Sequence, residues 1–80
     1  MIQIKTVAHF NNPENRFIVI TDTTGQMIHK VPLCRTVTQE KFEEKVILNQ
    51  CKNGKYFDVN SYDEAKRQWG RIKTCDYCFN

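Results

Sequence analysis

Long apolar runs are missing from this sequence. No stretch approaches the roughly 18 residues that a membrane-spanning helix requires. Met1 to Thr6 alternate polar and apolar side chains and lack the continuous apolar segment of a secretory signal. Three glycines and two prolines in 80 residues exclude collagen-like and low-complexity chains. We therefore expect a cytoplasmic protein with no membrane partner, folded as one domain over residues 1–80.

Catalytic motifs are also missing. The two histidines, His9 and His29, fall in predicted strands without a neighbouring glycine turn or a motif that would form an oxyanion hole. The acidic pair Glu43 and Glu44 would point about 100° apart on a helix, so its carboxylates would not converge on one substrate. We expect no enzymatic activity.

Cysteine is present in small number, and one pair has a suggestive spacing. Cys75-Asp76-Tyr77-Cys78 separates two thiols by two residues, as in zinc sites, but contains no glycine to help the backbone turn around a metal. In a reducing compartment all four cysteines would stay reduced. We expect no cofactor and keep zinc as the alternative. The residues that could supply the remaining ligands are Cys34, Cys51, His9 and His29, none of which forms a second closely spaced pair.

The first half of the chain reads as strands. Residues 2–10 alternate with a period of two, which predicts a half-buried strand. Residues 16–21 are apolar on both faces and suit a central strand. Asp22 to Gly25 has turn chemistry and leads into a third strand over residues 26–33, with Pro32 at its end or on an edge. Together these segments predict a meander.

The middle of the chain is ambiguous. Residues 34–45 favour a short helix capped by Thr36 or Thr38, with Phe42 and Val46 on its inner side. Residues 46–48 then read as a strand. Asn53-Gly54 predicts a tight type I′ hairpin that would place Cys51 opposite Tyr56.

The last third contains the clearest helix signal. Ser61 to Glu64 is a capping box, and Gly70 is a suitable C-cap. Residues 71–80 would return as a last strand or an extended tail. The predicted fold is α+β: a small antiparallel sheet of about five strands, one clear C-terminal helix and a possible short central helix. The inward stripe of the clear helix would be Tyr62, Ala65, Trp69 and Ile72.

Positive charge is concentrated in one part of the chain. Residues 52–73 hold six basic and three acidic residues, a surplus equal to the net charge of +3. We predict that these basic side chains form a partner-binding surface. The alternative is an ordinary solvated helix face on which Asp63 pairs with Arg67. The six basic residues are Lys52, Lys55, Lys66, Arg67, Arg71 and Lys73.

The chain resembles the small proteins with which bacteriophages and mobile elements block host machinery, including anti-CRISPR proteins. It shares with them its length, the expected sheet with one or two helices, and the lack of an active-site signature. The resemblance implies a stoichiometric inhibitor that occludes a surface of a larger host protein or ribonucleoprotein. The alternatives are direct nucleic-acid binding by the same surface and a zinc-stabilised domain. An uncovered edge strand near the C-terminus would also allow a homodimer.

Overall fold

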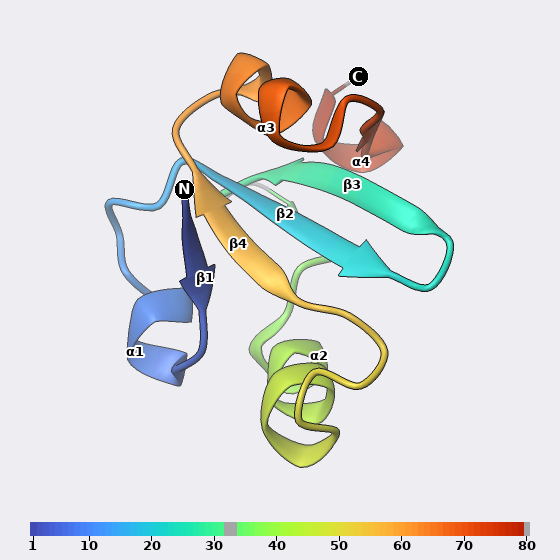
Figure 1. The fold of residues 1–80 in the computed structure, drawn as a ribbon. Coiled ribbons are helices and arrows are strands. Elements are labelled where there is room, and N and C mark those ends of the chain that lie inside the picture. The colour runs from blue at the N-terminus through green and yellow to red at the C-terminus, as the bar shows by residue number, and fades with distance from the viewer. Residues whose placement is uncertain (32–33, 80) are drawn as a thin grey trace.

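The structure is a computed structural model that describes residues 1–31 and 34–79, and it has the predicted α+β fold (Figure 1). One five-stranded sheet runs in the order β1-β4-β2-β3-β5. The sheet is mixed rather than antiparallel, because β5 pairs with β3 in parallel. The strands are β1 (Ile2–Ile4), β2 (Phe17–Asp22), β3 (Gly25–Lys30), β4 (Tyr56–Val59) and β5 (Lys73–Thr74).

Short helices lie on both sides of the sheet, with α1 and α2 on one side and α3 and α4 on the other (Figure 1). Among the described residues, no helix has both the length and the apolar character needed to cross a membrane. The helices are α1 (Val7–Phe10), α2 (Gln39–Phe42) with its continuation as the π-helix η1 (Glu43–Leu48), α3 (Tyr62–Trp69) and α4 (Asp76–Phe79).

The predicted central strand is confirmed. β2 lies between β4 and β3, and its neighbouring residues Ile18 and Val19 are both fully buried, one in each of two apolar clusters. Since successive side chains of a strand point to opposite faces, each face of the sheet carries a core of its own. The Asp22 turn is also confirmed, because the carboxylate accepts hydrogen bonds from the backbone N–H groups of Thr24 and Gly25.

The larger of these cores lies between the sheet and the helices α1, α2 and η1. Its aromatic rings contact one another: Phe10 stacks on Phe42 at 4.7 Å between ring centroids, and Tyr56 meets Phe42 edge-on at 5.1 Å. Such pairs stabilise a core beyond the area that they bury. The buried members, which we call the aromatic core, are Ile4, Phe10, Ile18, Phe42, Val46 and Tyr56.

The first strand is shorter than predicted. β1 ends at Ile4, and Thr6 begins helix α1 instead, because its side-chain oxygen accepts the backbone N–H of His9 at 3.1 Å. β1 pairs with β4 and not with β2, so the predicted meander is wrong. Predicted strand residue Pro32 lies outside the described residues, and β3 ends at Lys30.

The middle helix is confirmed, but it begins at Gln39 and continues to Leu48, past the predicted end at residue 45. Thr38 caps it by accepting the backbone N–H of Lys41, and Phe42 and Val46 are buried as predicted. The predicted strand over residues 46–48 is wrong, since the chain there belongs to η1. Residues four apart are adjacent on one face of a helix but about 13 Å apart along a strand, so burying Val46 beside Phe42 favours helix over strand.

The predicted Asn53-Gly54 hairpin is also wrong. β4 pairs with β1 and β2, and the positive φ angles of the preceding loop fall at Gln50 and Cys51 as well as at Gly54. Gly54 has φ +153°, and a Cβ on it would lie 1.8 Å from the backbone oxygen of Thr21. This glycine therefore serves the close passage of a loop beside β2, not a tight turn.

The helix α3 matches its prediction closely. Ser61 accepts the backbone N–H of Glu64 at 3.1 Å, and Gly70, with φ +74°, ends the helix. The Glu64 carboxylate completes the cap by accepting the N–H of Asn60. The predicted inward stripe packs on the second core, whose buried members are Val19, Ile28, Val59 and Ala65.

The C-terminal segment differs from the prediction of a last strand or an extended tail. It forms only the two-residue strand β5 and then turns into the short helix α4. Phe79 at the end of α4 lies 6.2 Å from the Phe17 ring, centroid to centroid, and beneath the Lys30 ammonium. We call residues 73–79 the C-terminal edge.

Candidate metal centre

Three cysteines and one histidine converge at the C-terminal edge. His29 lies in β3 and Cys34 follows that strand, while Cys75 follows β5 and Cys78 lies in α4. The parallel pairing of β3 and β5 brings them together, because Ile28 is the partner of Thr74 and accepts the backbone N–H of Cys75 at 3.1 Å. The residues that follow these partners, His29 and Cys75, are thereby neighbours.

The ligand atoms of this cluster are close enough to share one ion. The His29 Nδ1, Cys34 Sγ, Cys75 Sγ and Cys78 Sγ atoms all lie within 4.8 Å of one another. Nδ1 of His29 is 3.4 Å from the Cys34 sulfur and 3.9 Å from the Cys78 sulfur. The sulfurs of Cys34 and Cys75 are 3.7 Å apart. We call these four residues the His-Cys₃ cluster.

These separations fit a tetrahedron around zinc. With Zn–S about 2.3 Å and Zn–N about 2.0–2.1 Å, tetrahedral geometry places two sulfurs about 3.8 Å apart and a sulfur and a nitrogen about 3.5 Å apart. The three measured distances lie near these values. Three sulfurs and one imidazole also form a common donor set of structural zinc sites.

The cluster is largely dry. His29, Cys34 and Cys75 are buried, and Cys78 is half-buried. Burial lowers the pKa of His29, which favours the neutral imidazole that a metal requires. All four cysteines of the chain are free thiols, so none is withdrawn from the cluster by a disulfide.

The surroundings of the thiols favour ionisation of Cys75 and oppose ionisation of Cys78. Burial would raise the pKa of Cys75, but the backbone amides of Tyr77 and Cys78 bond to it and hold the pKa below its usual value. Burial and the neighbouring thiol of Cys34 raise the pKa of Cys78 to about 12. The surroundings thus favour the thiolate at Cys75 more than at Cys78, and a divalent cation would supply the charge needed to hold all three sulfurs as thiolates.

Further polar groups surround the sulfurs. The hydroxyl of Thr36 lies 2.8 Å from the Cys34 sulfur and 3.8 Å from that of Cys75. The backbone N–H of Lys30 favours the ionised form of Cys78. Donors to thiolate ligands tune and orient a metal site, so the cluster has the outer groups that such a site needs.

All four residues are among the candidate ligands of the sequence. Cys34, Cys75, Cys78 and His29 meet here, whereas the candidate Cys51 packs against the aromatic core near the side chain of Gln3. Four residues separate His29 from Cys34, so no second closely spaced pair marked them in the sequence. Thr36, a predicted helix cap, lies at the cluster instead.

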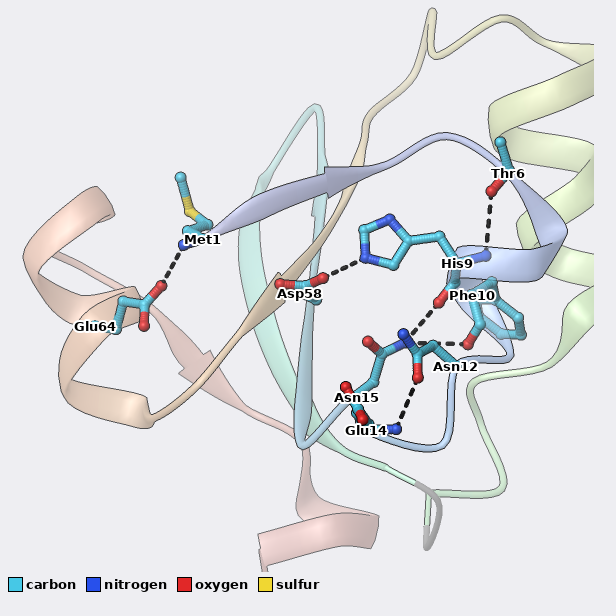
Figure 2. A network of polar contacts seen from close by, with 9 residues as sticks. All are labelled: Met1, Thr6, His9, Phe10, Asn12, Glu14, Asn15, Asp58 and Glu64. Atoms are coloured by element: carbon cyan, nitrogen blue, oxygen red, sulfur yellow. Dashed lines mark hydrogen bonds and ion pairs between the residues drawn. The ribbon is translucent and has the colours of Figure 1, made fainter.

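The other histidine has a different setting (Figure 2). His9 lies in α1, not in a strand, and its Nε2 contacts a carboxylate oxygen of Asp58 on β4. Asn15 donates to the backbone oxygen of His9 at 2.7 Å and so fixes the end of α1. No hydroxyl or thiol is among the described residues that line the hollow around this pair. The contact ties α1 to the sheet.

The predicted basic surface is exposed. Lys66 and Arg67 lie on α3, Arg71 follows it, and Lys73 lies in β5. Within the described parts of the chain none of the basic residues predicted to bind a partner forms an ion pair, and the predicted Asp63–Arg67 pair is not present. The remaining two, Lys52 and Lys55, lie in the loop before β4, which shares a hollow with Trp69 of α3. Partner binding by this surface stays a prediction.

Comparison of this chain with known proteins finds no matching family, no matching curated sequence and no matching solved structure.

Proposed function

We propose that this chain is a small zinc-binding domain in which the His-Cys₃ cluster holds one Zn²⁺. The observation that carries the proposal is the convergence of four ligand atoms within 4.8 Å from residues distant in sequence. Soft thiolates and a neutral imidazole select zinc over magnesium or calcium, which prefer oxygen ligands. The other thiol, Cys51, is outside the cluster and serves as an internal control.

The role of the proposed ion is structural. Four protein ligands fill a tetrahedral zinc and leave no open position for water or substrate. Two of the ligands come from β3 and the segment after it, and two come from the C-terminal edge. An ion held by all four would fasten that edge, whose own strand is only two residues long, to the sheet.

Metal analysis of the purified protein tests this proposal. We expect about one equivalent of zinc per chain, and cobalt substitution should give the absorption of a tetrahedral thiolate site. Serine replacements of Cys34, Cys75 and Cys78, made singly, should each weaken metal binding strongly, whereas Cys51→Ser should leave it unchanged. A protein that binds no zinc, or one whose affinity for zinc is equal in Cys75→Ser and Cys51→Ser, would refute the proposal.

The second candidate function is binding of a larger partner through the basic surface, without catalysis. Its support is that all six basic side chains are exposed and lack ion pairs within the described residues. Reversing Lys66 and Arg67 to Glu should abolish capture of a partner while leaving the melting temperature unchanged. Salt-dependent retention on generic DNA or RNA would identify a nucleic acid, and capture of one protein would identify an inhibitor-like role. Retained affinity in the reversed variant contradicts this function.

A further inference from the structure

A cavity of about 420 Å³ lies beside the His-Cys₃ cluster, between the α2–η1 helix and the start of α4. Its volume falls in the range of small-molecule sites. One wall is shared with the cluster, through His29, Thr36 and Cys75. The other sides come from the sheet, from the helix and from α4, so parts of the chain distant in sequence line this open cavity.

The floor of the cavity is apolar. Ile20 on β2 is the register partner of Met27 on β3 and of Tyr56 on β4, so these three side chains form one row across the sheet. Residues directly opposite each other on paired strands present their side chains to the same face. The ring of Tyr56 is covered by the aromatic core, so Ile20 and Met27, which are half-buried, offer the apolar surface to whatever occupies the cavity.

One polar group in this floor lacks a partner. Tyr56 is 3% exposed, and its hydroxyl, which keeps contact with the solvent at the cavity, forms no hydrogen bond within the described part of the chain. Burial raises the pKa of Tyr56 to about 12, so the hydroxyl keeps its proton and can donate to an acceptor. A ligand in the cavity could carry that acceptor.

The rim of the cavity is cationic on the helix side. Lys41 and Lys45 are four residues apart and so lie on one face of the α2–η1 helix. The opposing rim carries the carboxylate of Asp76. Lys45 also acts on Asp22, where it helps to lower the pKa of that carboxyl. Lys41 is exposed, makes no ion pair with the described residues, and is the cation available to a ligand.

We propose that this cavity binds a small molecule with an apolar body and one carboxylate group. The apolar body would cover Ile20 and Met27, beside the hydroxyl of Tyr56. The carboxylate would accept the hydroxyl of Tyr56 and pair with Lys41. Ile20, Met27, Tyr56 and Lys41 lie outside the His-Cys₃ cluster, so recognition of the ligand does not use the proposed ion, although His29, Thr36 and Cys75 form one wall of the cavity.

Octanoate is a suitable probe, with 1-octanol and octylammonium as matched compounds that share its chain but not its charge. Binding to the purified full chain is measured by calorimetry, and its location by chemical-shift changes at Ile20 and Met27. We expect saturable binding of octanoate, weaker binding of octanol and no binding of octylammonium. The metal content of the sample is measured separately, so a failure here is distinguishable from a failure of the zinc proposal.

Two conservative variants and two controls identify the recognising groups. Tyr56→Phe keeps the ring in the aromatic core and removes only the hydroxyl, and Lys41→Gln removes only the charge. Each should weaken octanoate binding by about fivefold or more. Tyr62→Phe and Lys66→Gln, both on α3 across the sheet, should not change it. Absence of octanoate binding, equal affinity in Tyr56→Phe and wild type, or equal binding of octylammonium would overturn the proposal.

Discussion

The aromatic core and the C-terminal edge are stabilised in different ways. The aromatic core is built from six buried apolar residues on α1, on the α2–η1 helix and on three strands, and its rings contact one another directly. The C-terminal edge has a two-residue strand, both of whose side chains are exposed, and a helix of four residues. Its buried centre is the His-Cys₃ cluster. We infer that apolar burial holds the first region and that a metal reinforces the second.

The largest effect is expected from removing the centre of the aromatic core. Phe42 is fully buried and touches the rings of Phe10 and Tyr56, so Phe42→Ala should cost about 3–5 kcal/mol of unfolding free energy. For a domain of this size that is enough to unfold the chain, metal site included. Denaturant titration followed by circular dichroism measures the unfolding free energy of each variant. The control is Leu48→Ala on the same helix, where the side chain is 77% exposed. Equal stability of the two variants would contradict the assignment of the core.

A smaller loss of unfolding free energy is expected from a change in the loop before β4, which passes beside β2. The positive φ of Gly54 alone should make Gly54→Ala cost about 1–3 kcal/mol of unfolding free energy, and the collision of its Cβ with the backbone of Thr21 should add to that cost. Gly25→Ala is the matched control, because Gly25 also has a positive φ but meets nothing within 4 Å. The difference between their unfolding free energies isolates the collision from the backbone strain. No difference would show that the loop can move away from β2.

Removing the cap of α3 tests a region that lies outside both the aromatic core and the C-terminal edge. Ser61→Ala removes the acceptor of the Glu64 backbone N–H and should cost about 1 kcal/mol. Gln68→Ala, at an exposed position of the same helix, is the control. Zinc binding should be unchanged in both variants, since neither touches the edge. If Gln68→Ala lost as much stability as Ser61→Ala, the loss in Ser61→Ala could not be assigned to the cap.

The smallest effect is a pH-dependent one at the β2–β3 turn. Hydrogen bonds from the side chain and backbone of Thr24 lower the pKa of Asp22, so its carboxylate stabilises the fold above the unfolded pKa and this contribution is lost as pH falls through the lower folded value. Asp22→Asn should therefore melt slightly below wild type at pH 7 and equally at strongly acid pH. Glu14→Gln is the control. A melting difference that persists unchanged at acid pH would exclude this cause.

Local signals in the sequence predicted the elements whose ends carry caps or turns. The Asp22 turn, the Thr38 and Ser61 caps and the Gly70 end are all where the residue types indicated. Each depends on hydrogen bonds between residues close in sequence, so no knowledge of the tertiary fold is needed.

The predictions from the sequence were wrong where contacts between distant segments decide the local structure. Residues 46–48 have strand character, yet burying Val46 beside Phe42 requires a helix there. Asn53-Gly54 has the residue types of a hairpin turn, but the structure uses Gly54, at φ +153°, for a close passage. The parallel pairing of β3 and β5, which no short-range pattern encodes, is what selects His29 and Cys34 from the candidate ligands and brings them to Cys75 and Cys78.

The most direct test of this account is hydrogen exchange on the zinc-loaded protein and on the same protein treated with a chelator. We predict that removing the metal will abolish the protection of amides in residues 73–79, while amides of β2 and β4 remain protected by the aromatic core. The Cys51→Ser protein should behave as wild type. Unchanged protection of the C-terminal edge, or loss of protection throughout the sheet, would contradict the division between a core held by apolar packing and an edge reinforced by a metal.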